Sequence, residues 1–125
     1  MFIANFFKKK KSSTVLAVYD LEKISSSYDF LIFFQVAFMY KKKNNFKNLD
    51  LCLIMGSLNG FKPMQFERED NFKLDRANLR LNYIIFQSIN MYRKHFNNFY
   101  MLKNRNEANE ILNKYKNFFP YDFNI

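Results

Sequence analysis

The residues best suited to chemistry in this 125-residue chain follow three separate apolar segments. They combine a carboxylate, a hydroxyl, an amide and two cations with a glycine that lets the backbone approach a ligand closely. These residues are Tyr19, Asp20, Gly56, Ser57, Lys103, Asn104 and Arg105. The mixture suits a polyhydroxy or phosphorylated ligand, but by itself it is not a catalytic signature. The same residue types also cap helices at strand ends, so a purely structural role stays open.

Two apolar strands joined by a helix must position these residues. Residues 14–20 and 49–55 are almost continuously apolar, which is typical of parallel strands covered on both faces. Residues 28–40 form a helix that is apolar almost all round, with one of Ser25 to Ser27 expected as its N-cap. We therefore expect a right-handed βαβ unit. Its helix is either packed on both faces or lacks a neighbour that this chain does not supply.

The second half of the chain continues the alternation of helix and strand. Residues 58–75 read as a loop, with Asp75 or Asn78 expected to cap the next helix. The apolar face of that helix is expected to contain Leu81, Ile84, Ile85, Ile89 and Tyr92. Residues 99–102 then form a short strand, Asn104 opens a third helix, and residues 118–123 are expected to end in the stub of a fourth strand.

This order of elements predicts an α/β fold, a Rossmann-like three-layer domain. Its parallel sheet has three or four strands in the order 3-2-1-4, with helices on both faces. Residues 1–13 read as a basic N-terminal tail, and residues 14–125 as a single domain. Ligands of such sheets bind at the carboxyl ends of the strands, near the switch in strand order. We therefore expect the polar residues that follow the strands to share one site.

Several classes of site are excluded by what the sequence lacks. It contains neither a G-x-G-x-x-G fingerprint after the first strand nor a G-x-x-x-x-G-K-[ST] loop. One histidine and one cysteine cannot form a structural zinc site of the usual kind, so no metal is expected. His95 is interpreted as a residue that complements a helix dipole, and Cys52 as a small core hydrophobe. A lone cysteine suits a reducing compartment.

The net charge of +9 suggests an anionic partner, although lysine can also be merely a solvated residue. Lys8, Lys9, Lys10 and Lys11 follow the apolar residues 1–7, a segment too short to span a bilayer. This segment is either a frayed terminus or an interfacial anchor on an anionic membrane surface. We therefore expect a cytoplasmic chain that can be peripheral to the inner face of the membrane.

Short motifs spread over the chain resemble the N-terminal half of GT-B-like glycosyltransferases of bacterial surface-polysaccharide clusters. The motifs are Ala17-Val18-Tyr19-Asp20-Leu21, Ser27-Tyr28-Asp29-Phe30-Leu31, Gly60-Phe61, Arg105, Glu107-Ala108 and Phe119-Pro120-Tyr121. In such proteins two Rossmann-like halves face a cleft: the N-terminal half meets the acceptor, and the C-terminal half holds the nucleotide-sugar.

The resemblance implies an acceptor-side domain whose catalytic second half is absent here. It implies an acceptor glycan as ligand, and a missing C-terminal domain or a second copy of the chain as partner. No cofactor is expected in this chain, because the nucleotide-sugar would bind to the second domain, and the chain alone is expected to be inactive. On this interpretation Asp20 is the catalytic candidate, as general base or as partner of the acceptor hydroxyl. Gly56 and Ser57 allow close approach of the ligand, and Arg105 binds anionic groups.

Two other interpretations stay open. The chain could be a small basic α/β module that binds nucleic acid or another polyanion, with an affinity that falls linearly with the logarithm of the salt concentration. We rank this second, because the charge can reflect composition alone. The chain could also be a truncated product without a function of its own.

Overall fold

A computed structural model describes residues 13–57, 59–61 and 71–123 of the chain. Its elements, in order, are β1 (Thr14–Asp20), α2 (Asp29–Lys43), β2 (Asn48–Ile54), α3 (Asn71–Arg80), the π-helical η2 (Leu81–Phe86), α4 (Gln87–Met91), the 3-10 helix η3 (Arg93–His95), β3 (Phe99–Leu102), α5 (Arg105–Leu112) and β4 (Asn117–Phe119). The anchor expected at Lys8–Lys11 lies outside the described residues.

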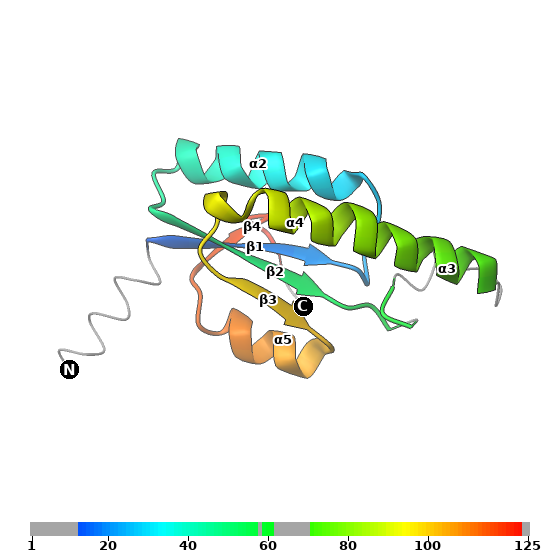
Figure 1. The fold of residues 1–125 in the computed structure, drawn as a ribbon. Helices are drawn as coiled ribbons and strands as arrows, with labels where there is room; N and C mark the ends of the chain where they lie inside the picture. The colour runs from blue at the N-terminus through cyan, green and yellow to red at the C-terminus, as the bar shows by residue number, and fades with distance from the viewer. Residues whose placement is uncertain (1–12, 58, 62–70, 124–125) are drawn as a thin grey trace.

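The four strands form one parallel sheet in the order β3-β2-β1-β4, which confirms the predicted order. Figure 1 shows α2 and the continuous helix α3–η2–α4 on one face of this sheet, and α5 on the other. The handedness of the crossovers explains this division. The chain moves in one direction from β1 to β3, and then crosses back past β2 and β1 to form β4.

Both central strands are apolar because helices cover both of their faces. All seven residues of β1 are buried, as are six of the seven in β2. Alternate side chains of each strand enter different clusters: Ala17 and Leu51 pack under α2, whereas Val18 and Cys52 pack under α5. This arrangement is the reason that neither strand shows the polar–apolar alternation of a half-exposed sheet.

Helix α2 has a buried side and an uncovered side. Phe30, Phe34 and Ala37 face the sheet, and the outward-facing side chains are exposed. The expected serine N-cap is wrong: the cap position is Tyr28, which makes no side-chain capping bond. The hydroxyl of Ser27 still accepts a hydrogen bond from the first helical amide, that of Asp29, at 3.2 Å.

The C-terminus of α2 is closed by a Schellman motif. Asn45 has a φ of 59°, and the amide of Phe46 donates to the carbonyl of Lys41 at 3.0 Å. Asparagine tolerates this left-handed conformation better than most residues, so it can stand where glycine is usual. The chain can therefore turn at once into β2.

The long helix α3–η2–α4 begins at Asn71, so the predicted loop of residues 58–75 is too long and neither Asp75 nor Asn78 is its cap. Its buried face contains Ala77, Leu81, Ile85 and Ile89. Four-residue steps on an α-helix of 3.6 residues per turn rotate a stripe by about 40° each. The wider π-helical turn of η2 reduces this rotation and keeps the stripe on the sheet.

Candidate functional site

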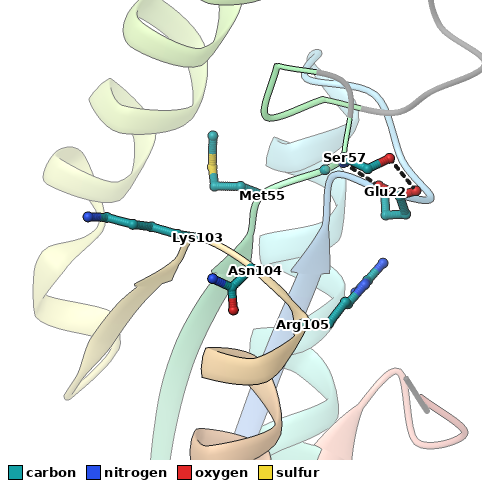
Figure 2. A pocket seen from close by; sticks show the side chains of 7 residues that line it. Glu22, Met55, Ser57, Lys103, Asn104 and Arg105 are labelled. Carbon is teal, nitrogen blue, oxygen red and sulfur yellow. Dashed lines mark hydrogen bonds between the residues drawn. The ribbon is translucent and has the colours of Figure 1, made fainter.

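The carboxyl edge of the sheet brings together residues from three strand ends. A cavity of about 170 Å³ opens here, and Figure 2 shows the side chains around it. It is lined by Glu22, Met55, Gly56, Ser57, Lys103, Asn104 and Arg105. Five of the seven residues singled out from the sequence therefore line one cavity, as expected for an open parallel sheet.

Asp20 is buried beneath the cavity and holds Arg105 in place. Its side chain is 2% exposed, and its Oδ2 lies 2.8 Å from Nη1 of Arg105, the first residue of α5. Its Oδ1 accepts a hydrogen bond from the amide of Glu22 at 3.0 Å. Because both carboxylate oxygens are engaged within the fold, Asp20 is placed to orient Arg105 rather than to meet a ligand in this cavity. The base role expected for Asp20 stays a prediction.

Glu22 contributes the carboxylate that faces the cavity, and sequence reasoning missed it. Its Oε2 accepts from the amide of Ser57 at 2.5 Å, and its Oε1 accepts from the hydroxyl of Ser57 at 2.9 Å (Figure 2). The turn that aims Glu22 forms because the amide of Glu22 bonds to Asp20. The sequence did contain a signal for this role, because Glu22 is a carboxylate only two residues beyond the end of β1.

Gly56 is required by the fold itself. A Cβ atom at this position would lie 2.1 Å from the carbonyl oxygen of Phe61 and 2.8 Å from that of Leu21. The amide of Gly56 instead donates to the carbonyl of Gly60 at 2.7 Å, which closes the loop after β2. The close approach predicted for Gly56 is therefore made by the chain's own backbone, while Gly56 also lines the cavity.

Asn104 caps α5, as the sequence predicts. Its Oδ1 accepts from the amide of Glu107 at 3.0 Å, and the carboxylate of Glu107 accepts from the amide of Lys103 at 2.8 Å. This reciprocal pair resembles a capping box and satisfies two amides at the start of the helix. The cap fixes the positions of the neighbouring Lys103 and Arg105 at the cavity.

The structure places Tyr19 away from the cavity. Its side chain is fully buried on the α2 side of the sheet, where its ring meets the rings of Phe30 and Phe33 edge-on at 5.1 Å. Its hydroxyl donates to the carbonyl of Ser25 at 2.6 Å. Burial raises the pKa of this hydroxyl well above its usual value. Side chains alternate along a strand, so Tyr19 and Asp20 point to opposite faces.

A second cavity lies where the strand order switches, between the carboxyl ends of β1 and β4. Its volume is about 230 Å³, and Asp20 forms part of its wall. The other lining residues are Val18, Lys23, Ile24, Pro120, Asp122 and Phe123. The Nζ of Lys23 lies 5.1 Å from the ring centroid of Phe123. Sequence reasoning expected a site near the switch but did not include the residues after β4, which the order 3-2-1-4 places there.

A second buried carboxylate, Asp50, lies within β2 and is 4% exposed. The amide of Asn98 donates to its Oδ1 at 3.0 Å, and the hydroxyl of Tyr115 donates to its Oδ2. The hydroxyl of Tyr115 also lies 3.1 Å from that of Tyr100. Burial and the bond to Asp50 raise the pKa of Tyr115, so this hydroxyl stays protonated and remains a donor. The network fastens the segment after α5 to the sheet.

Within residues 13–57, 59–61 and 71–123, no group of three or more His, Cys, Asp and Glu side chains is arranged to hold a metal ion. No helix in these ranges is both long enough and apolar enough to cross a membrane.

No protein-family model, curated protein or solved structure matches the chain. Any function assigned to it therefore depends on the residues at the carboxyl edge and on the distribution of charge around the fold.

Proposed function

We propose that the chain is the acceptor-side domain of a glycosyltransferase-like protein of cell-envelope polysaccharide synthesis. The cavity at the carboxyl edge would bind one part of an acceptor glycan. The observation that supports this proposal is the composition of the cavity wall, in which the carboxylate of Glu22, the hydroxyl of Ser57 and the guanidinium of Arg105 lie around one opening (Figure 2). The parallel sheet adds support, because such sheets bind ligands at this edge.

The cavity offers hydrogen-bonding groups of both kinds. Sugar hydroxyls donate and accept at once, so they are best bound by a mixture of carboxylates, amides and cations. An ionised carboxylate has about four lone-pair positions. Glu22 uses two of them for Ser57 and keeps capacity for a ligand hydroxyl. The guanidinium of Arg105 supplies donors.

Glu22 is also better placed than Asp20 to take a proton from an acceptor hydroxyl. Glu22 lines the cavity, whereas Asp20 is buried and bonded to Arg105 and to the amide of Glu22. A general base must be within hydrogen-bond reach of the proton that it removes. In this proposal Glu22 contacts the reacting hydroxyl and Asp20 is a positioning residue that holds Arg105.

The cavity is too small to hold a whole donor and acceptor. Typical ligand pockets have volumes of roughly 300–1,000 Å³, whereas this one has about 170 Å³. In the proposed function a second domain supplies the nucleotide-sugar and completes the site. The chain alone is expected to bind glycan weakly and to transfer no sugar from a nucleotide-sugar donor.

The proposal is tested by titrating the full, ¹⁵N-labelled chain with lactose, maltose and chitobiose, and separately with UDP. At least one disaccharide is expected to shift the amides of Ser57, Asn104 and Arg105, while UDP shifts none of them. Glu22→Gln should weaken this binding about tenfold, because a hydrogen bond to a charged group is lost. Glu110→Gln serves as the matched control, because it removes an exposed carboxylate on α5 that does not line the cavity.

Three results would contradict the proposal. The first is an absence of shifts at the carboxyl edge with every sugar. The second is an equal effect of Glu22→Gln and Glu110→Gln. The third is measurable sugar transfer by the isolated chain, which would show that no second domain is needed.

A further inference from the structure

Large exposed apolar side chains are concentrated on the outer surface of the helix layer formed by α2 and α3–η2–α4. Along α2 they follow one another at helical spacing and form a stripe. The stripe contains Tyr28, Ile32, Val36 and Met39, and the neighbouring helix exposes Leu79, Tyr83 and Met91. Single exposed apolar residues need no explanation, but such a grouping marks an interaction surface.

Aromatic contacts hold the C-terminal ends of α2 and α4–η3 together. The ring of Phe34 stacks on that of Tyr92 at 5.2 Å, and Phe38 meets His95 edge-on at 5.2 Å. Figure 1 shows both helix ends at the amino edge of the sheet. The exposed Met39 and Met91 lie close to the C-terminal ends of these helices, with exposed fractions of 66% and 71%.

The same helix ends present a group of cations. Together with Met39 and Met91 we call these residues the basic corner: Lys41, Lys42, Lys43, Lys47, Arg93 and Lys94. Segments 41–48 and 92–98 contain no acidic residue, and none of these six cations forms a salt bridge with another described residue. Lys41 and Lys42 lie over the ring of Phe38, at 5.5 and 4.6 Å from its centroid.

We propose that the basic corner docks the chain on an anionic membrane surface. Exposed apolar side chains beside lysines match the boundary between acyl chains and anionic headgroups. A nucleic acid would bind the cations but would gain little from exposed methionines. A second copy of the chain would bring two corners of the same charge together, which is unfavourable.

This docking leaves the carboxyl-edge cavity facing water. The basic corner lies at the amino ends of the strands and the cavity at their carboxyl ends. A seven-residue strand separates the two by about 20 Å. The docking is independent of what the cavity binds, so it holds whether or not the proposed glycan function is correct.

Flotation with vesicles tests the proposal on the full chain. The vesicles are made of phosphatidylcholine alone, or of equal parts of phosphatidylcholine and phosphatidylglycerol. Because Lys8–Lys11 would also attract anionic lipid, every variant is made in a chain in which these four lysines are replaced by glutamine. This parent chain is expected to bind the anionic vesicles and not the neutral ones.

Two matched double variants measure the charge contribution. Lys42→Gln with Lys43→Gln is expected to weaken the binding about 30-fold, since each lysine near an anionic surface contributes about a fivefold gain in affinity. Lys23→Gln with Lys103→Gln removes two exposed lysines at the carboxyl edge, about 20 Å from the basic corner. This pair should weaken binding less than about threefold, because distant charges are screened. An equal loss from both pairs would overturn the proposal.

The apolar contribution separates a membrane from other partners. Met39→Gln with Met91→Gln keeps the charge and should weaken vesicle binding about tenfold. The proposal is overturned if the parent chain binds no anionic vesicles, or if it binds a DNA duplex more tightly than vesicles and the methionine variant leaves that binding unchanged. It is also overturned if light scattering shows a dimer that Met39→Gln with Met91→Gln dissociates.

Discussion

Helix α5 is tied to the sheet near both of its ends by buried carboxylates that meet different partners. Asp20 bonds to Arg105, the first residue of the helix, which is one-third exposed and lines a cavity. Asp50 bonds to Tyr115, three residues after the helix ends, and to Asn98. One carboxylate thus has a charged partner that reaches solvent, whereas the other has only neutral donors among these partners.

The position of a buried acid within its strand decides its role. Asp50 lies near the start of β2, so the segments that enter the strands can satisfy it within the fold. Asp20 lies at the last position of β1, where the loops diverge and leave cavities on both sides. A carboxylate inside the sheet therefore fastens the fold, while one at the strand end orients a cation toward a ligand site.

A methyl group at Gly56 is expected to disrupt the region around Asp20 and to leave the region around Asp50 intact. Of the substitutions considered, it should lower the stability most. The clashing atoms belong to the backbone of Phe61 and Leu21, so they cannot rotate away. Gly56→Ala should lower the free energy of unfolding by about 3 kcal/mol in urea. Gly60→Ala is the control, because its Cβ meets only the flexible end of Met55. Its positive φ should cost about 1 kcal/mol.

Amide chemical shifts of Gly56→Ala locate the damage. They should change at Ser57 and Arg105 and stay unchanged at Asn98, which belongs to the other end. Equal shifts at both ends, or equal losses of stability in the two glycine variants, would contradict the separation of the two regions.

Removing the hydroxyl of Tyr115 is expected to destabilise the region around Asp50. Tyr115→Phe leaves a buried carboxylate oxygen without its hydroxyl donor, which should lower the free energy of unfolding by about 2 kcal/mol. Tyr100→Phe removes a hydroxyl that bonds to Tyr115 and should cost less than about 1 kcal/mol. A larger loss in Tyr100→Phe than in Tyr115→Phe would place the carboxylate's main support elsewhere.

Removing the charge of Arg105 should lower the free energy of unfolding less than Gly56→Ala or Tyr115→Phe does. It should weaken ligand binding strongly. Water reaches the one-third-exposed Arg105, so the remaining Asp20 is not left fully unsolvated, and Arg105→Gln should cost about 1 kcal/mol. The same variant should abolish the sugar-induced shifts at Ser57. Arg105→Lys, which keeps the charge, should retain part of both. If Arg105→Gln lowered the free energy of unfolding by more than about 3 kcal/mol, the ion pair of Asp20 would stabilise the fold at least as much as the contacts of Asp50 do.

Local patterns in the sequence predicted the sheet well. The continuous apolar runs at 14–20 and 49–55 predicted strands covered on both faces, and β1 and β2 have these bounds to within one residue. Asn104 was predicted as a helix start from its residue type, and it makes the capping bond. The start of α3 was missed because polar and apolar residues alternate from Asn71 to Asp75, which is not the spacing of an amphipathic helix.

The candidate site depended on tertiary contacts that the sequence does not encode locally. Glu22 is held at the cavity by its bonds to Ser57, 35 residues away along the chain. Arg105 is held there by its bond to Asp20, 85 residues away. The orientation of Tyr19 away from the cavity could have been predicted, because neighbouring side chains on a strand alternate. Asp50 offered a usable signal, since a lone carboxylate in a strand buried on both faces must have hydrogen-bond partners. Which residues those partners are could be learned only from the fold.

The thiol of Cys52, which lies on β2 under α5, can report on the difference between the two carboxylates. Burial, and secondly the charge of Asp20, raise the pKa of Cys52 from 9.0 to about 12. As the pH rises, the thiol loses its proton in the unfolded chain before it does so in the folded chain. The contribution of the protonated thiol to stability is therefore full below pH 9.0 and is lost as the pH rises toward about 12. At about pH 9.5 the loss should be about 0.8 kcal/mol.

Comparison with Cys52→Ala isolates this effect, because the tyrosines titrate in both proteins. The stability difference between the two should shrink by about 0.8 kcal/mol between neutral pH and about pH 9.5. Ultraviolet titration of the thiolate then compares the carboxylates directly. Asp20→Asn should lower the pKa of Cys52, since a repelling charge is removed. Asp50→Asn should leave it unchanged. Equal shifts in the two variants would mean that Asp20 and Asp50 act on the interior of the sheet alike.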